Sequence, residues 1–300
     1  MSPSPSGETC SPHRQEAPVS LISRRFATAA LAAALVPLAL AGCAKDETKP
    51  AAGGTSGSAS GSGSGSAPAV KLIKDGTLLV CTHSGFKPFE YPEGGKIVGY
   101  DIDIADLIAK KVNAKTEVVD IDFAQITSGA AFAAKKCDMA AAGMTINDKR
   151  KAALGVSDPY FTSKQALLVK KDSPIKDLAG MKGKMLGVQT DTTGKEYAEK
   201  NVSVNGYQMK IFEDAASLSN AVKAGTVDGS LNDSGVMLNF AKDNADTAVV
   251  AQIDTQEQYG LATGKDNTAM LQLMNQVLKD FKADGSLGKI DQKWLGAKTS

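Results

Sequence analysis

The chain has 300 residues, of which 42% are hydrophobic, 22% charged and 5% aromatic, with a formal net charge of +1. This length and apolar content suffice for one or two domains with buried cores. Because the charge is balanced and no basic run occurs, the composition argues against nucleic-acid binding. The two Gly-rich motifs that bind phosphate groups are both absent, and no residues have the spacing of metal ligands. We therefore expect no cofactor and no metal.

Residues 1–43 have the features of an export signal. Arg24 and Arg25 precede an apolar stretch, residues 26–40, that is too short to span a membrane comfortably. A basic start, a short apolar run and small residues at the cut site are typical of a secretory signal peptide. The paired arginines leave both the Sec and the twin-arginine export routes open, and residues 1–20 read as an extension whose translation is an open question.

The signal ends in Leu-Ala-Gly-Cys, which resembles a bacterial lipobox. The resemblance implies that Cys43 is lipidated and becomes the first residue of the mature chain. Residues 44–70 are rich in Gly, Ser and Ala, and they cannot bury enough apolar surface to fold. We expect a flexible linker about 25–30 Å across, which holds the folded body at the outer, periplasmic face of the cytoplasmic membrane. A weak membrane anchor and an untethered tail are the alternatives.

Four cysteines are present, and Cys10 and Cys43 fall in the two segments already described. Cys81 and Cys137 remain for the folded body, and export makes a disulfide between them chemically feasible. In adjacent parallel strands, however, Cys81 would lie near a strand end and Cys137 near a strand start. Such an offset can exceed the limit of about 7 Å between the Cα atoms of a disulfide, so the sequence leaves the pairing open.

The first half of the folded body alternates strands with helices. A strand is expected at residues 77–82, and a loop with a Gly94-Gly95 turn follows it. Asp101 is expected to cap a helix, because the apolar residues after it recur at helical spacing. Further elements are a strand, a helix and a strand at residues 116–121, 126–136 and 138–144.

The second half repeats the pattern. Strands are expected at residues 165–171, 184–190, 227–233 and 258–263, with a helix opening near Thr192 and Thr193. A last helix has an apolar stripe from Met270 to Phe281 and Gly285 as its C-cap. The alternation predicts an α/β fold with parallel sheet, built as two α/β lobes with a cleft between them.

Ligands of open α/β sheets bind beyond the carboxyl ends of the strands. The residues that the strands deliver there combine one cation, one anion, hydroxyls, amides and aromatic rings. These candidate ligand-binding residues are His83, Phe86, Phe123, Ala142, Gly143, Thr145, Arg150, Gln189, Thr192, Thr193, Asn232 and Asp233.

This combination matches a zwitterion. The Arg150 guanidinium can bind a carboxylate through two parallel hydrogen bonds, and the helix start at Thr193 adds N–H donors. Asp233 can pair with an α-ammonium group, and Phe86 and Phe123 can enclose the ligand side chain. Gly143 is expected to let the ligand approach the backbone.

Each residue also has a structural alternative. Arg150 could lie at the surface where a helix starts, and Phe123 could be a core residue. Asp233 and the two threonines could cap helices without contacting any ligand.

The chain resembles the polar amino acid group of extracellular solute-binding proteins, family 3, which serve ABC importers. The resemblance spans about residues 72–295 and is carried by "FKPFEY", "GKIVGYDIDIADLIAKKV", "AAAGMTINDKR", "SDPYF", "LGVQTDTTGKEYA", "VDGSLND" and "GKIDQKWLG". It implies a periplasmic-binding-protein-like fold, with two lobes joined by hinge strands near residues 165–171 and 258–263. Lobe 1 would comprise residues 71–167 and 260–300, and lobe 2 residues 168–259.

The family resemblance also implies roles for the candidate residues. Arg150, Thr145 and Thr193 would hold the ligand carboxylate, and Asp233 with Gly143 would hold the ammonium group. The protein would be a monomer that closes over a polar amino acid and delivers it to permease and ATPase subunits in the membrane.

His83 departs from the family pattern, since relatives that bind basic amino acids or glutamine often carry Asp there. Glutamine, glutamate or asparagine is therefore favoured over lysine or arginine, with Gln189 and Asn232 bordering the same side-chain pocket. The alternatives are a dehydratase-like enzyme, for which His83 and Asp233 are the only acid–base pair, and a receptor-coupled sensor. The absence of a G-x-S-x-G motif disfavours the enzyme.

Overall fold

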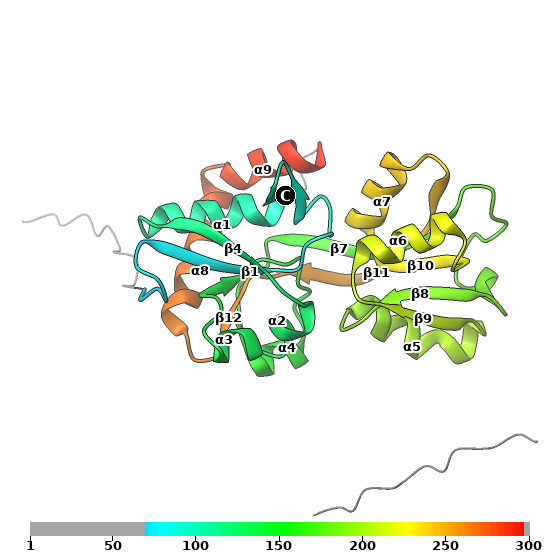
Figure 1. Ribbon diagram of the computed structural model, residues 1–300, viewed down its shortest axis with the longest axis horizontal. Helices are drawn as coiled ribbons and strands as arrows, with labels where there is room; N and C mark the ends of the chain where they lie inside the picture. Colours follow the sequence, from blue (N-terminus) through cyan, green and yellow to red (C-terminus); the bar gives the residue numbers. More distant parts are fainter. Residues whose placement is uncertain (1–69, 297–300) are drawn as a thin grey trace, which may run out of the picture. The chain divides into compact units, whose positions relative to one another are not determined.

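The computed structural model describes residues 70–296, and the expected signal peptide, Cys43 and most of the expected linker lie outside this range. Two five-stranded sheets, each with its own helices, form two lobes (Figure 1). The α/β fold predicted from the sequence, with two lobes, is confirmed. No helix within residues 70–296 is long and apolar enough to cross a membrane.

The first lobe contains a sheet with the strand order β4-β1-β5-β12-β6. Strand β1 is parallel to β4 and β5, whereas β12 is antiparallel to both of its neighbours. The strands are β1 (Thr77–Thr82), β4 (Lys115–Asp120), β5 (Met139–Ala140), β6 (Leu154–Val156) and β12 (Ala262–Gly264), beside a hairpin of β2 (Tyr91–Glu93) and β3 (Lys96–Val98). The helices are α1 (Tyr100–Lys111), α2 (Phe123–Thr127), α3 (Ala130–Ala133), α4 (Asp148–Ala153), α8 (Thr268–Ala283) and α9 (Ser286–Leu295).

The second lobe contains a sheet with the order β11-β7-β10-β8-β9, in which β8, β9 and β10 are parallel. Its strands are β7 (Phe161–Lys170), β8 (Met185–Gln189), β9 (Gln208–Phe212), β10 (Gly229–Asp233) and β11 (Thr247–Tyr259). Its helices are η1 (Ala179–Met181), α5 (Thr193–Asn205), α6 (Ala215–Ala224) and α7 (Ser234–Asp243). Strand β9 was not among the expected elements; it is an edge strand, and none of its five residues is fully buried.

The antiparallel strands β7 and β11 connect the two lobes (Figure 1). Strand β7 pairs with β11 from Phe161 and with β10 from Gln165, so the first crossing lies a few residues before the expected range 165–171. The expected strand 258–263 is divided. Tyr259 ends β11 in the second sheet and Ala262 begins β12 in the first, so the second crossing lies at Gly260 and Leu261.

Helix α1 begins at Tyr100, and its N-cap position is occupied by Gly99. The prediction that Asp101 caps this helix is wrong. Asp101 is fully buried, and its carboxylate accepts hydrogen bonds from the Gly143 amide at 2.8 Å and the Tyr160 hydroxyl at 2.7 Å. Asp101 therefore fixes the turn after β5 rather than the end of its own helix. Helix α8 ends at Ala283, with Asp284 as its C-cap and Gly285 following in a left-handed conformation.

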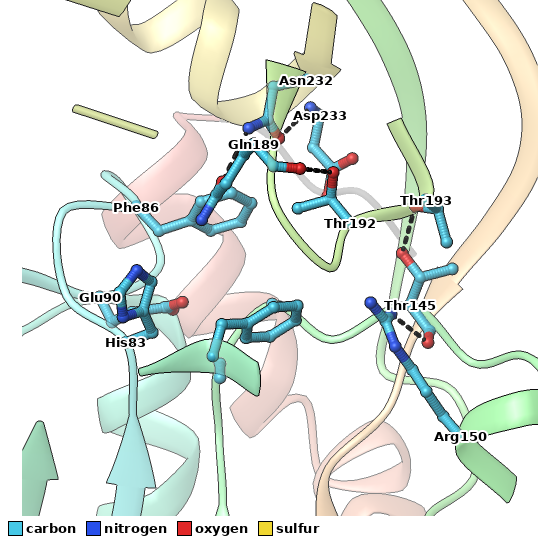
Figure 2. A pocket seen from close by; sticks show the side chains of 13 residues that line it. His83, Phe86, Glu90, Thr145, Arg150, Gln189, Thr192, Thr193, Asn232 and Asp233 are labelled. Carbon is cyan, nitrogen blue, oxygen red and sulfur yellow. Dashed lines mark hydrogen bonds between the residues drawn. The ribbon is translucent and has the colours of Figure 1, made fainter. Parts of the chain in front are cut away.

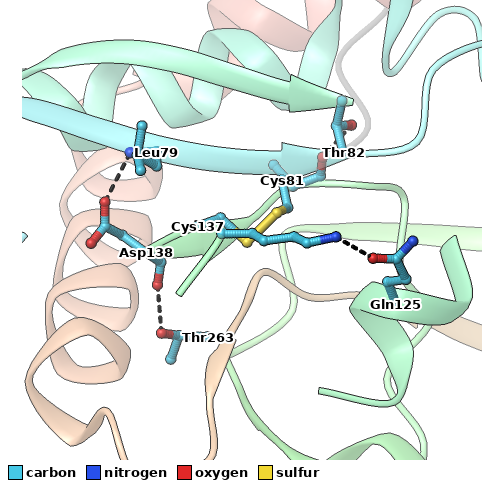
Figure 3. The surroundings of a disulfide bond; sticks show 9 residues. Leu79, Cys81, Thr82, Gln125, Cys137, Asp138 and Thr263 are labelled. Atoms are coloured by element: carbon cyan, nitrogen blue, oxygen red, sulfur yellow. Dashed lines mark hydrogen bonds between the residues drawn. A yellow bond between two sulfur atoms is a disulfide. The ribbon is translucent and has the colours of Figure 1, made fainter. Parts of the chain in front are cut away.

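A disulfide joins Cys81 on β1 to Cys137, with 5.6 Å between the Cα atoms (Figure 3). The offset expected for two parallel strands does not apply, because β5 is only two residues long and Cys137 lies in the turn before it. Both cysteines belong to an apolar cluster that includes Phe123, Ala142 and Met144. The bond therefore stabilises the region directly behind two candidate ligand-binding residues.

We predict that the Cys81→Ala, Cys137→Ala double variant unfolds more easily than the wild type. The bond spans 56 residues, and closing such a loop in the unfolded chain stabilises a fold by about 2–4 kcal/mol. Urea titration of both proteins measures the difference in free energy of unfolding. Adding a thiol reductant should weaken the wild type to the level of the variant and leave the variant unchanged; equal stability of the oxidised wild type and the variant would contradict the prediction.

Candidate functional site

A pocket with about 340 Å³ of empty volume lies between the two lobes (Figure 2). All twelve candidate residues named from the sequence line it, although they come from segments more than a hundred residues apart. One further residue, Glu90, also lines it. The lining is His83, Phe86, Glu90, Phe123, Ala142, Gly143, Thr145, Arg150, Gln189, Thr192, Thr193, Asn232 and Asp233.

Strand ends and helix starts position these side chains. In the first lobe, His83 and Phe86 follow β1, Phe123 begins α2, and Arg150 lies in α4. In the second lobe, Gln189 ends β8, Thr193 begins α5, and Asn232 and Asp233 end β10. The pocket is thus assembled at the carboxyl ends of the parallel strands of both sheets, as open α/β sheets favour.

Arg150 is buried, with an exposed fraction of 5%, which excludes the surface position considered as its alternative. Its Nη1 donates to the Thr145 carbonyl at 2.7 Å, and its Nη2 donates to the Asp191 carbonyl of the second lobe at 2.9 Å. The guanidinium carbon lies 5.2 Å from the centre of the Phe123 ring. Burial lowers the pKa of Arg150, while Asp233 and three other carboxylates act in the opposite direction.

The hydroxyls of Thr145 and Thr193 lie 3.4 Å apart and come from different lobes. Both donate to Oε2 of Glu257, at 3.1 and 3.0 Å, and the amide of Gln165 donates to the same oxygen at 3.0 Å. Glu257 lies on β11 and Gln165 on β7, so each of the two connecting strands contributes one residue to this cluster. Sequence reasoning missed Glu257, whose neighbours alternate between exposed and partly buried.

Asp233 is buried, and its carboxylate accepts hydrogen bonds from the Gln165 amide and the Tyr259 hydroxyl. It occupies the N-cap position of α7, but its side chain makes no capping hydrogen bond. Burial and the nearby Glu257 raise the pKa of Asp233 to about 7, although the hydrogen bonds and Arg150 act against the shift. A cation placed beside Asp233 would favour its ionised form.

Gly143 has a φ of 51°, and a Cβ atom there would lie 2.6 Å from the Phe86 ring. Its amide already donates to Asp101. Gly143 therefore lets the Phe86 side chain approach the backbone at this point, and it lines the pocket as well.

Thr192 is the N-cap of α5, since its hydroxyl accepts from the Lys195 amide at 3.1 Å. It lines the pocket as well, so capping and pocket formation coincide. Asn232 donates to Oε1 of Gln189 at 2.9 Å, which joins these two amides across adjacent strands.

His83 Nδ1 lies 3.0 Å from the Ile121 carbonyl. Because a carbonyl oxygen only accepts, Nδ1 carries the proton. In the neutral ring, Nε2 is then an acceptor, and it is buried with no hydrogen-bond partner within residues 70–296. Among the residues that the structure describes, no cluster of His, Cys, Asp and Glu could hold a metal ion.

Glu90 is the residue of the pocket that sequence reasoning missed. It is 1% exposed, and its Oε2 has no hydrogen-bond partner in the described part of the chain. Burial, together with Asp101, Asp120 and Asp233, raises its pKa well above the usual range of a carboxylic acid. The sequence signal was present in "FKPFEY", where a carboxylate stands between two aromatic residues close after a strand.

We predict that Asp233→Asn removes part of the pH dependence of stability in the ligand-free protein. The folded carboxyl has a pKa of about 7 against an ordinary value of 3.8, so the folded state binds the proton more tightly than the unfolded state. Its contribution is full below about pH 3.8 and is lost as the pH rises to about 7. The stability of the wild type relative to the variant should fall by roughly 2–4 kcal/mol over that window.

Urea unfolding at a series of pH values measures this difference. Asp75→Asn is the matched control, because Asp75 is exposed and does not line the pocket. A difference between wild type and Asp233→Asn that stays constant from pH 4 to pH 7.5 would contradict the prediction.

Comparisons with known proteins support the two-lobed fold. The arginine-binding extracellular protein ArtP of Bacillus subtilis (strain 168) is 30% identical over 220 residues, covering 73% of this chain and 86% of ArtP. An ancestral arginine-binding protein, solved with arginine and with glutamine, is 38% identical, with a TM-score of 0.69. The two alignments cover 73% and 74% of this chain and 98% and 99% of the solved chains.

A third structure is that of the ancestral amino acid-binding protein AncCDT-1, a precursor of cyclohexadienyl dehydratase. It is 33% identical with a TM-score of 0.68, covering 73% of this chain and 95% of its own. Residues 78–297 match one family throughout. The chain belongs to the bacterial extracellular solute-binding proteins, family 3.

Proposed function

We propose that this protein is a lipid-anchored binding protein that captures a polar amino acid outside the cytoplasmic membrane and delivers it to an ABC importer. One observation carries the proposal. A buried cation from the first lobe, Arg150, and a buried carboxylate from the second, Asp233, line the same pocket. An α-amino acid bears the complementary charges a short distance apart, so each lobe can bind one end of it.

Hinge closure follows from where the ligand contacts lie. A ligand carboxylate between Arg150, Thr145 and Thr193 would contact both lobes, because Thr193 belongs to the second lobe. The ammonium group of the same ligand would contact Asp233, which also belongs to the second lobe. Such contacts exist only when the lobes are together, so ligand binding favours the closed state. The connecting strands β7 and β11 are the segments that would bend, around residues 157–163 and 259–261.

The ligand class rests on the pocket and on the relatives. The sequence favours glutamine, glutamate or asparagine, on the ground that His83 replaces an acidic residue. Two of the three relatives described above are named for arginine, and one of these two was also solved with glutamine. Both lines of support agree on an α-amino acid with a polar side chain. The partners that such a binding protein requires are the permease and ATPase subunits of the importer.

Catalysis is the second candidate function. A structural neighbour is described as a precursor of a dehydratase, and His83 and Asp233 line one pocket here. An enzyme would convert its ligand during incubation, whereas a binding protein returns it unchanged; chromatography of the ligand after incubation distinguishes them. A receptor-coupled sensor would bind the same ligand, and it would differ in having no permease as a partner.

We expect Arg150→Ala to weaken ligand binding by roughly 2–5 kcal/mol, because a buried carboxylate loses its charged partner. The ligand is first identified by a thermal-shift screen of the twenty amino acids, and isothermal titration then measures its affinity. Arg150→Lys is the matched control: it keeps the charge but not the two parallel hydrogen bonds, so it should bind with intermediate affinity. Unchanged affinity in Arg150→Ala would exclude this role, and a screen without any hit would exclude the proposed function.

We expect Cys43→Ser to release the protein from the membrane, because the thiol is the atom that the lipid would modify. Fractionation of cells that express the wild type and the variant measures the distribution between membrane and soluble fractions. Cys10→Ser, which lies in the N-terminal extension, is the control and should remain with the membrane. Membrane association of the Cys43→Ser variant equal to that of the wild type would contradict lipid anchoring.

A further inference from the structure

The Glu90 carboxylate is held in place from its own backbone. The Phe86 amide donates to the Glu90 carbonyl at 2.9 Å, and the Glu90 amide donates to the Phe86 carbonyl at 3.3 Å. The preceding residue, Phe89, is fully buried against Tyr100, Phe161 and Tyr259. The side chain therefore starts from a fixed position and lines the pocket, although no donor among residues 70–296 reaches its Oε2.

The other carboxylates around Glu90 are already engaged. Asp101 accepts from Gly143 and Tyr160, and Asp120 accepts from the amide and hydroxyl of Ser84 at 2.9 and 2.6 Å. Asp233 accepts from Gln165 and Tyr259. Asp101 Oδ1 also lacks a partner within residues 70–296, but Asp101 does not line the pocket, whereas Glu90 does. A buried acceptor without a donor costs free energy, and at Glu90 a bound ligand can recover it.

The formal charges of the pocket lining do not balance. Arg150 contributes one positive charge, while Asp233 and Glu90 contribute one negative charge each when ionised. The α-carboxylate and α-ammonium groups of an amino acid would match Arg150 and Asp233. One carboxylate is left over, and either a proton or an additional positive charge on the ligand would neutralise it.

The neutral form of His83 does not supply that charge. Its Nδ1 proton is directed to the Ile121 carbonyl, so the neutral ring presents an acceptor at Nε2. Three further carboxylates raise the pKa of Glu90 by repulsion: Asp101 of α1, Asp120 of β4 and Asp233 of β10. The surroundings of Glu90 therefore favour a hydrogen-bond donor, and above all a cation.

Resting on the proposed function, we propose that Glu90 binds the far end of the ligand side chain and that the ligand is a basic amino acid, with a guanidinium or ammonium group at that end. This revises the preference for neutral and acidic ligands that His83 alone suggested. Glutamate would place a second carboxylate against Glu90, and it is the polar amino acid that the pocket should exclude most strongly.

The protonation state of Glu90 should depend on the charge of the ligand. Burial keeps Glu90 protonated in the ligand-free pocket over a wider pH range than usual, and a cationic ligand would favour the ionised form. Binding of a basic amino acid should then release a proton, whereas a neutral amide ligand should leave Glu90 protonated. The titratable groups around it are Asp101, Asp120, Asp233 and His83. Either kind of ligand would place its α-ammonium group beside Asp233, so Asp233 would be deprotonated in both complexes.

Isothermal titration of the purified protein with arginine, lysine, glutamine and glutamate tests the proposal. Each ligand is measured in two buffers of equal pH and different ionisation enthalpy, which gives the number of protons released. We expect arginine or lysine to bind most tightly and to release more protons than glutamine. Glu90→Gln should weaken binding of the basic ligand by roughly 30-fold or more and change glutamine affinity far less.

Two further variants complete the test. Glu93→Gln removes an exposed carboxylate from the hairpin after Glu90 and should leave every affinity unchanged. Glu90→Asp keeps the charge, so it should retain the preference for basic over neutral ligands even if the fold tolerates Glu90→Gln poorly.

The outcomes separate this inference from the proposed function. Tight binding of glutamine or glutamate with no response to Glu90→Gln overturns the role of Glu90 and leaves amino acid binding intact. Equal losses for arginine and glutamine overturn it too, because they indicate a structural role for Glu90. Failure of every amino acid to bind overturns both.

Discussion

The buried guanidinium of Arg150 is the interaction on which the rest of the pocket depends. Removing such a cation from water is costly unless several acceptors surround it. Here the carbonyls of Thr145 and Asp191 accept from it, the Phe123 ring lies beside it, and four carboxylates lie near it. Because Thr145 belongs to the first lobe and Asp191 to the second, the same group that can hold a carboxylate also contacts both lobes.

The two connecting strands contribute side chains that hydrogen-bond to residues lining the pocket. Gln165 of β7 donates to both Asp233 and Glu257, and Glu257 of β11 accepts from hydroxyls of each lobe. The pairing of β7 and β11 also shifts its register between Ile253 and Glu257. A ligand carboxylate that engaged Thr145 and Thr193 would compete with Glu257 for the same two hydroxyls, which couples occupancy of the pocket to the strands between the lobes.

The sequence predicted the α/β fold, and the residues that it singled out at strand ends gather in one pocket. Strands β1 and β8 have a run of apolar residues that stops at a polar residue, so their ends, and with them Gln189, were visible in the pattern. The end of β10, with Asn232 and Asp233, was marked only by Val227 and Leu231 before it. Arg150 was visible because it follows a run of small residues at a fixed spacing. What periodicity cannot indicate is which way a buried polar side chain points.

Asp101 and Glu90 illustrate this limit. Asp101 stands where a capping residue is common, yet its carboxylate turns inward to the Gly143 amide, a contact between segments 42 residues apart. Glu90 is a charged residue in a loop and by composition alone would be placed in solvent. Tertiary packing of Phe89 decides otherwise, and the local signal is confined to the position of Glu90 between Phe89 and Tyr91. The division of the strand at Gly260 likewise depends on which sheet each half joins.

The bond between Cys81 and Cys137 has a consequence for when the protein matures. Thiols stay reduced in the bacterial cytoplasm and are oxidised after export, so the covalent link behind Phe123 and Ala142 can be made only once the chain has left the cell interior. Newly made chains inside the cell lack this link. The covalent support of the pocket wall is therefore completed in the compartment where the ligand is bound.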